Sequence, residues 1–174
     1  MILTVTLNAA LDVTYEVASL TPHRTHRVQA VHHRAGGKGV NAAGVLTTLG
    51  VPATATGLLG GRAGEDIVAD LDRRGIAHAF FRCAEESRRT VNVVSVDDGD
   101  ATIFNEPGPV VSPSEWDDLL AGLPPLIEST GCTAVVLAGS LPRGVPADAY
   151  GQLVAAVRGR GARVVLDADG AALR

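Results

Sequence analysis

The sequence predicts an α/β fold in which a parallel sheet has helices on both faces and a small β-sheet lies beside it. Short apolar, β-branched runs alternate with segments of helical length, and several of these segments end at a glycine, which is typical of repeated β-α-β units. Two further stretches alternate polar and apolar residues, and one contains an Asp-Gly turn at Asp98 and Gly99, which predicts the small sheet. With 174 residues, 46% of them hydrophobic, the chain can bury a substantial core.

The first half of the chain contains three of the expected strands and two of the expected helices. Apolar β-rich runs predict strands at 2–7, 53–58 and 76–81. Apolar residues at helical spacing predict helices at 40–49 and 64–74, which Gly50 and Gly75 end. This order is the repeated unit of a parallel sheet.

The second half repeats the scheme. A helix is expected from Ser112 or Ser114, either of which can cap it, to about Ile127, and another from Pro146 to near Gly161. The buried runs TAVVLAG and ARVVLDA, at 133–139 and 162–168, predict two more strands. Sheets of this kind bind ligands beyond the carboxyl ends of their strands, so candidate residues are sought there.

The two alternating stretches are expected to form antiparallel strands of the small sheet, near 13–33 and 90–105. VTYEV and THRVQAVHH make up the first stretch, and TVNVVSVDDGDATIFN makes up the second. No linker or repeat separates them from the rest, so the small sheet is interpreted as a flap on one α/β domain.

Charge and hydropathy argue against two classes of partner. A net charge of −4 and a pI near 5.7 give no basic footprint for nucleic acid. No apolar run reaches the roughly 18 residues that a membrane span needs. The N-terminus looks like a strand and not like a signal peptide, so a cytoplasmic location is expected.

The cysteines and histidines do not predict a metal site. Cys83 and Cys132 are far apart in sequence and form no C-x-x-C motif, so both are interpreted as packing residues. Four of the histidines lie close together in the sequence but lack ligand spacing, and they are expected on an exposed strand of the flap: His23, His26, His32 and His33.

The segment RAGGKGVNAAG, residues 34–44, holds the only lysine of the chain, Lys38. It is not a Walker A motif, because Gly39 follows the lysine and His32 stands where the leading glycine belongs. It also fails as a dinucleotide fingerprint, because Ala42 takes the third glycine position and no strand is predicted directly before the turn. A classical nucleotide site is therefore not expected here.

The same segment still has the chemistry of an anion or hydroxyl site. Glycines at 36, 37 and 39 leave backbone N–H groups unshielded at the start of a helix, where the dipole favours negative charge. Asn41 offers a donor and an acceptor in the first turn. The pattern suits a polyhydroxylated or phosphorylated ligand, and the alternative is a tight turn without a ligand.

Three other positions are candidates for the same ligand. Asp12 follows the first strand and can accept hydrogen bonds from two neighbouring sugar hydroxyls, or else cap a turn. Arg88 and Arg89 can clamp a phosphate, or else be solvated. Ser140, beside Gly139, follows a buried strand at the same edge of the sheet and can approach a phosphate oxygen.

These motifs resemble a known family, the PfkB or ribokinase-like sugar kinases. The residues at the spacing of its N-terminal signature are Gly36, Gly37, Lys38, Gly39, Asn41, Ala43, Gly50 and Gly60. The segments TLNAALD, FNEPGP, GSLPRGV and VLDADGAAL are similar to those of its 1-phosphofructokinases, with Ala9 in place of a proline. The resemblance runs from Met1 to Arg174.

The resemblance implies roles for the candidates and a name for the flap. Asp12, Gly37 and Asn41 would hold the sugar hydroxyls, with Gly36 in the same loop. Lys38, Arg88 and Ser140 would lie near the phosphate of a sugar phosphate. The small sheet would be the lid of a ribokinase-like fold, which closes over the sugar and often contributes to dimerisation.

The resemblance also implies a reaction and an incomplete site. The expected reaction transfers the γ-phosphate of ATP, with Mg²⁺, to fructose 1-phosphate. The family's catalytic G-A-G-D motif and its N-x-x-E motif do not occur in the sequence, so residues 1–174 are expected to be the N-terminal part of a kinase domain, truncated at the C-terminus, with no catalytic residue and no activity alone.

Alternatives to this interpretation remain open. They are a non-catalytic sugar-phosphate-binding fragment and a kinase acting on tagatose 6-phosphate or fructose 6-phosphate. A homodimer through the lid or through the exposed sheet edge is the expected assembly.

Overall fold

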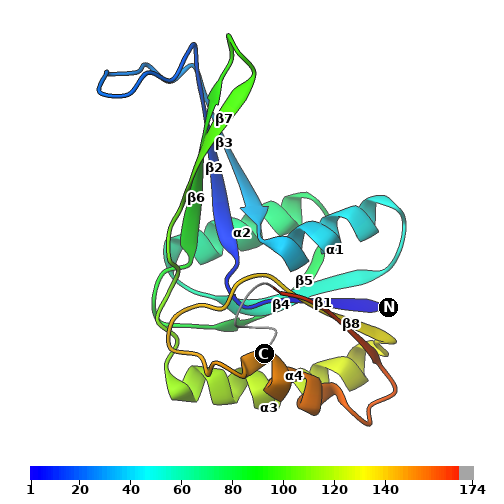
Figure 1. Ribbon diagram of the computed structural model, residues 1–174. Helices are drawn as coiled ribbons and strands as arrows, with labels where there is room; N and C mark the ends of the chain where they lie inside the picture. The colour runs from blue at the N-terminus through cyan, green and yellow to red at the C-terminus, as the bar shows by residue number, and fades with distance from the viewer. Residues whose placement is uncertain (169–174) are drawn as a thin grey trace.

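The computed structural model describes residues 1–168, and its body is a parallel sheet of five strands (Figure 1). The strand order is β5-β4-β1-β8-β9, and every neighbouring pair is parallel. The strands are β1 (Ile2–Thr6), β4 (Ala53–Leu59), β5 (Ala77–Arg82), β8 (Ala134–Ala138) and β9 (Arg163–Asp167). The predicted α/β class is therefore confirmed, and the expected strands lie within a few residues of the observed ones.

Helices cover both faces of this sheet, as expected (Figure 1). The pair α1 (Lys38–Thr48) and α2 (Gly61–Arg73) covers one face, and the pair α3 (Pro113–Thr130) and α4 (Ala149–Val157) covers the other. Each face has its own apolar core. Side chains alternate along β1, so Leu3 and Val5 pack in the core of α3 and α4, whereas the buried Thr6 has the opposite orientation, toward the start of α1.

Local sequence explains where these helices begin and end. Ser112 caps α3 in a capping box with Glu115, Pro113 occupies the first turn, and Gly131 ends the helix with a left-handed φ of 61°. Helix α4 is shorter than the predicted 146–161, because residues 144–148 form a turn and the chain leaves the helix before Gly159, whose φ is 78°. No helix within residues 1–168 is long and apolar enough to cross a membrane.

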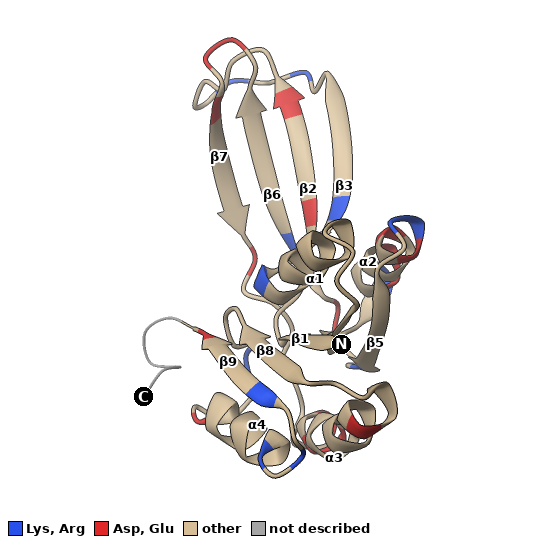
Figure 2. Ribbon diagram, turned by 90° about the vertical axis from the view of Figure 1, so that its right-hand side faces the viewer, with Lys and Arg blue, Asp and Glu red and all other residues tan. Residues whose placement is uncertain are grey.

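The second sheet, which we call the lid, has four strands and stands away from the body (Figures 1 and 2). Its order is β3-β2-β6-β7, with β2 (Ala10–Val17), β3 (Ala30–Gly36), β6 (Arg88–Ser95) and β7 (Asp100–Asn105). The prediction of a purely antiparallel sheet is wrong, because β2 and β6 are parallel. The chain passes through α1, β4, α2 and β5 between these two strands, which is the long crossover that parallel pairing requires.

Strand β3 differs from the prediction at both ends. It begins at Ala30 and not near residue 25, so His32 and His33 lie exposed on the strand, whereas His23 and His26 lie in the loop before it. It also runs directly into Gly37, although no strand was expected before this turn. The hairpin of β2 and β3 thus delivers the glycine segment to the start of α1.

Candidate functional site

The junction between β3 and α1 is built so closely that side chains are excluded at two positions. Gly37 is the N-cap of α1 with φ of 109°, a conformation that other residues rarely adopt, and a Cβ there would lie 2.8 Å from Thr6 Cγ2. A Cβ at Gly36 would overlap the carboxylate of Asp12. The two glycines therefore let the backbone of the junction approach both β1 and Asp12.

The N-terminus of α1, like that of α4, has no side-chain cap. In contrast, Ser112 caps α3, and Glu86 accepts a hydrogen bond from the Ala63 amide in the first turn of α2 at 3.1 Å. Because the first amides of a helix have no partner within the helix and the dipole adds positive potential, the start of α1 suits an anion or a hydroxyl oxygen.

Asp12 is the third residue of β2 and lies half-buried at the foot of the lid, so it does not cap a turn. It is paired with Arg34 on β3 and with Thr90 on β6. Burial raises the pKa of the Asp12 carboxyl, and the hydrogen bond with Thr90 and the charges of Arg88 and Arg34 offset this only in part. The protein therefore does not fully compensate the charge of the Asp12 carboxylate, which can still accept hydrogen bonds from ligand hydroxyls.

Arg88 begins β6, and its guanidinium is held by three groups. Its Nε donates to the carbonyl of Asn8 at 3.1 Å, and its Nη1 donates to Thr90 Oγ1 and Asn105 Oδ1, each at 3.3 Å. Burial lowers the pKa of Arg88, and Asp12 and Glu106 oppose this by favouring the charged form. A half-buried cation thus lies on the same side of the lid as Asp12.

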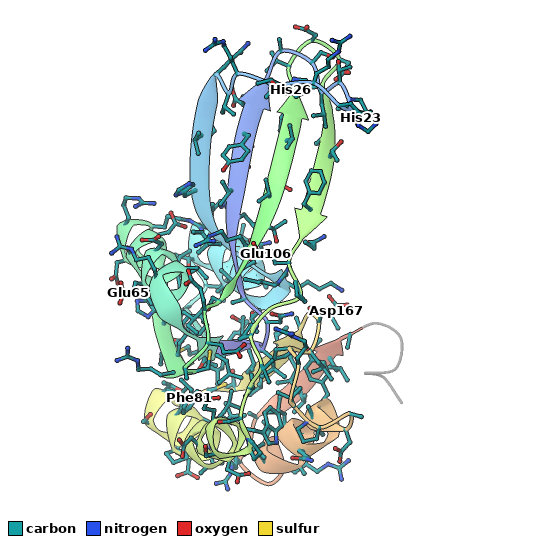
Figure 3. The ribbon with its side chains drawn as sticks, turned by 90° about the vertical axis from the view of Figure 1, so that its left-hand side faces the viewer. His23, His26, Glu65, Phe81, Glu106 and Asp167 are labelled. Atoms are coloured by element: carbon teal, nitrogen blue, oxygen red, sulfur yellow. The ribbon has the colours of Figure 1, made fainter. Side chains whose placement is uncertain are left out.

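Arg89 has different partners, so the two arginines do not form one clamp. Its Nη2 donates to Glu86 Oε1 at 3.0 Å, and its backbone amide donates to Glu106 Oε2 at 2.7 Å. Glu106 lies at the foot of the lid, where β7 leaves the sheet (Figure 3). Glu106 therefore holds the start of β6.

Ser140 and Lys38 approach from the body. Ser140 follows β8 and is exposed, and its Oγ accepts a hydrogen bond from Asn8 Nδ2 at 3.2 Å. A Cβ on Gly139 would lie 3.9 Å from Lys38 Cβ, so the loop after β8 faces the first residue of α1. Lys38 Nζ lies 3.3 Å from Asp167 Oδ1, at the carboxyl end of β9 (Figure 3).

These contacts join most of the predicted residues into a closed circuit, which we call the ring. Its members, each in contact with or adjacent in sequence to the next, are Asp12, Thr90, Arg88, Asn8, Ser140, Gly139, Lys38, Gly37 and Gly36. A carboxylate, two cations, a hydroxyl and the start of a helix thus lie along one succession of neighbouring residues. This set matches a ligand that has both hydroxyls and a phosphate.

The ring includes two unpredicted residues, Asn8 and Thr90, and omits two candidates, Asn41 and Arg89. Asn8 connects Arg88 to Ser140, although the TLNAALD segment in which it lies had pointed only to Asp12. Asn41 lies exposed in the first turn of α1, and among residues 1–168 no hydrogen bond links its side chain to the ring. The structure therefore brings together six of the seven residues to which the resemblance assigns roles.

One cleft, of about 300 Å³, touches the ring at Arg88 and is lined by residues 86–89 and 106–108. Another of about 500 Å³ lies between α2 and β5, where Figure 3 labels Glu65 and Phe81, and it contains none of the predicted residues. Within residues 1–168, no group of three His, Cys, Asp or Glu side chains is placed to hold a metal ion.

The glycine segment and the lid have counterparts in a family of known proteins. The model of the pfkB family carbohydrate kinases matches residues 5–174. The chain belongs to this family. The resemblance that the glycine segment indicated is thereby confirmed.

Solved structures of family members superpose closely on the chain. A protein named "possible 1-phosphofructokinase" from Thermotoga maritima is 32% identical with a TM-score of 0.87, over 95% of this chain and 53% of its own. Phosphofructokinase-2 from Escherichia coli, in complex with fructose-6-phosphate, is 28% identical with a TM-score of 0.89, over 99% of this chain and 56% of its own. Ribokinase from Giardia lamblia, at 20% identity and a TM-score of 0.68, shares the fold.

The chain thus spans about half the length of these proteins. The segment VLDADGAAL, which contributed to the resemblance, lies in part at residues 169–174, outside the described residues.

Proposed function

We propose that the protein is the sugar-phosphate-binding part of an ATP-dependent kinase that phosphorylates the C6 hydroxyl of fructose 1-phosphate, giving fructose 1,6-bisphosphate. The observation that supports this most directly is the ring, which joins the Asp12 carboxylate to Lys38, Arg88 and Ser140. A carboxylate recognises vicinal hydroxyls, and two cations with a hydroxyl recognise a phosphate. The 32% identity to the Thermotoga maritima protein favours fructose 1-phosphate as the acceptor.

A second acceptor is supported by one observation. Phosphofructokinase-2 from Escherichia coli was solved with fructose-6-phosphate, and its structure superposes on this chain. Fructose 6-phosphate, or the similar tagatose 6-phosphate, presents the same groups at other carbons. The ring does not distinguish among these ligands by chemistry alone, so the acceptor is decided by measurement.

The donor side of the reaction requires ATP and Mg²⁺, and the motifs that the resemblance links to that side do not occur in the sequence. No metal-binding cluster occurs within residues 1–168, and the G-A-G-D and N-x-x-E motifs are absent from the sequence. We therefore propose acceptor binding for this chain, and we assign neither a donor site nor a general base to its described residues.

Calorimetry with the 174-residue chain tests the proposal. We expect fructose 1-phosphate to bind more tightly than fructose 6-phosphate, tagatose 6-phosphate or unphosphorylated fructose, and we expect no turnover with MgATP. The variant Asp12→Ala is expected to lose binding. Lack of affinity for all three sugar phosphates would contradict the proposed function, and equal affinity for fructose would contradict the role of the phosphate.

Assembly and location are also proposals. Large apolar side chains on the lid are more than half exposed, namely Val31, Val96, Ile103 and Phe104, which supports a homodimer through the lid. Sedimentation of Ile103→Asp should then show a monomer where the wild type shows a dimer. The free thiols of Cys83 and Cys132, both buried as expected, are compatible with a reducing compartment such as the cytoplasm.

A further inference from the structure

Asn8 is the residue through which the ring passes from the lid to the body. It lies between β1 and β2 and is only 7% exposed. Its backbone carbonyl accepts a hydrogen bond from Arg88, and its side chain reaches Ser140, which is 132 positions away in the sequence. Gly108 packs against the amide so closely that a Cβ there would overlap Asn8 Oδ1.

The surroundings of the amide decide which of its ends faces Ser140. Asn8 Nδ2 lies 3.2 Å from Ser140 Oγ and 3.5 Å from the carbonyl oxygen of Pro107. The opposite orientation would place Oδ1 against this carbonyl, so that two acceptors would face each other. Oδ1 is instead buried without a hydrogen-bond partner within the described residues. Asn8 therefore donates to Ser140.

This direction determines what the serine hydroxyl can do. A hydroxyl has one hydrogen to donate, and an amide nitrogen only donates. Because Ser140 Oγ accepts from Asn8, the hydroxyl hydrogen of Ser140 must point to another group, and Ser140 is exposed. A phosphate oxygen, which accepts hydrogen bonds, is the complementary ligand group.

Asn8 restricts Arg88 in a similar way. The hydrogen bonds of Arg88 use Nε, toward the Asn8 carbonyl, and Nη1, toward Thr90 and Asn105. Among residues 1–168, Nη2 has no partner of this kind. Asn8 thus contacts both groups, Arg88 through its backbone carbonyl and Ser140 through its side-chain amide.

We infer that Asn8 is a positioning residue that makes the Ser140 hydroxyl a hydrogen-bond donor toward the phosphate of the bound ligand. The inference rests on the proposed function, since it concerns how the same site recognises the phosphate. Asn8 itself does not touch the ligand in this account. It acts through Ser140 and through the orientation of Arg88.

Asn8→Asp tests the inference, because it keeps the shape of the side chain and replaces the donor by an acceptor. The Ser140 hydroxyl would then donate to the introduced carboxylate and no longer to the ligand. We expect the affinity for fructose 1-phosphate, measured by calorimetry, to fall about tenfold to a hundredfold, as for loss of a charge-assisted hydrogen bond.

The same substitution in a Ser140→Ala background separates this effect from simple charge repulsion. Without the hydroxyl, Asn8→Asp should reduce the affinity only about threefold, from the added charge alone. An equal loss in both backgrounds would overturn the inference. Circular dichroism of each variant checks that it folds.

A second measurement keeps the inference testable if Asn8→Asp does not fold or if the wild type binds no sugar phosphate. In the ligand-free chain, the side-chain NH₂ resonances of Asn8 should shift when Ser140 is changed to Ala, because the acceptor is lost. Unshifted resonances would overturn the contact and the inference. Absence of wild-type binding, in contrast, would contradict the proposed function.

Discussion

The carboxylates of Asp12, which is half-buried, and Asp70, which is buried, lie on either side of β3 and behave in opposite ways. The carboxylate of Asp12, on β2, lies over Gly36, whereas that of Asp70, on α2, accepts a hydrogen bond from the amide of the preceding residue, Ala35, at 2.9 Å. The pKa of Asp12 is raised, and that of Asp70 is lowered. Gly36 and Ala35, which are neighbours on β3, thus contact two aspartates whose pKa values shift in opposite directions.

The difference comes from how completely the protein satisfies each group. Burial also disfavours the charge on Asp70, but the Ala35 amide and the guanidinium groups of Arg74, at 3.1 Å, and Arg73 outweigh it and lower the pKa. The carboxylate of Asp12 interacts with Thr90 and with the charges of Arg88 and Arg34, and these do not offset the effect of burial on its pKa. A carboxylate whose bonds are complete is structural, and one whose bonds are incomplete is available to a ligand.

The largest expected effect is that of Asp12→Asn on binding. The amide removes the charge that accepts two sugar hydroxyls, so we expect the affinity for fructose 1-phosphate to fall about a hundredfold, equivalent to about 2.7 kcal/mol. The thermal midpoint should stay the same or rise, because the raised pKa means that the ionised carboxylate opposes folding at neutral pH. Calorimetry and thermal unfolding measure the two effects. Undiminished affinity would remove Asp12 from the site.

Asp70→Asn should show the reverse pattern. The amide oxygen can still accept from Ala35, but the charge that pairs with Arg74 and Arg73 is lost, so we expect a loss of about 2 kcal/mol in stability. The affinity of the folded protein should change less than about twofold. Urea unfolding measures the loss, and Asp72→Asn, on the exposed side of the same helix, is the control. Equal losses for both variants would contradict the comparison.

The pH dependence of stability follows from the lowered pKa of Asp70. The stabilisation is complete above the pKa of an unfolded aspartate, about 4, and is lost as the pH falls through the lower folded value. Asp70→Asn should therefore flatten the acid side of the stability profile below about pH 4. An unchanged slope would show that other carboxylates dominate there.

Gly36→Ala should disturb Asp12 without changing its charge. The added Cβ would overlap the carboxylate, which must rotate or move, and we expect the affinity for fructose 1-phosphate to fall about tenfold, or about 1.4 kcal/mol. Gly151→Ala is the matched control, because nothing lies within 4 Å of the new methyl group in α4. That control should bind normally and gain up to about 1 kcal/mol of stability. Normal binding by Gly36→Ala would show that Asp12 does not need its observed position.

The smallest expected effect is the pH dependence of binding. Because the pKa of Asp12 is raised, protonation should begin to weaken the affinity at a higher pH than an ordinary aspartate would allow. The sugar phosphate itself titrates at about pH 6, so the profile must be compared with that of Asp12→Asn. In that variant only the titration of the ligand remains. Parallel profiles for the two proteins would contradict the role of the ionised carboxylate.

The sequence allowed much of the fold to be predicted, because the relevant signals are local. Apolar runs and glycine stops located the strands and helices of the body, and a serine cap at Ser112 or Ser114 marked the start of α3, which the structure places at Ser112. The parallel pairing of β2 with β6 was missed, since alternation of polar and apolar residues does not reveal which strands become neighbours. The loop of residues 18–29 was partly taken for a strand for a similar reason.

The sequence predicted most residues of the candidate site but not the contacts that join them. Lys38, Gly36 and Gly37 were evident as a glycine segment before a helix, and Asp12, Arg88 and Ser140 as polar groups beside strands. Asn8 and Asp70 were missed. An asparagine in a turn and an aspartate in a helix have ordinary local explanations, and their importance depends on contacts with residues far away in the sequence.

The sequence by itself determined the order of the elements and the types of side chain that face a ligand, because backbone propensity and hydrophobic periodicity act over a few residues. Only the tertiary structure decided which of these side chains have all their hydrogen bonds and ion pairs within the protein and which do not. Whether Asp12 and Asp70 bind a ligand or hold the fold depends on donors supplied by other strands and helices, and burial makes each missing or present donor count.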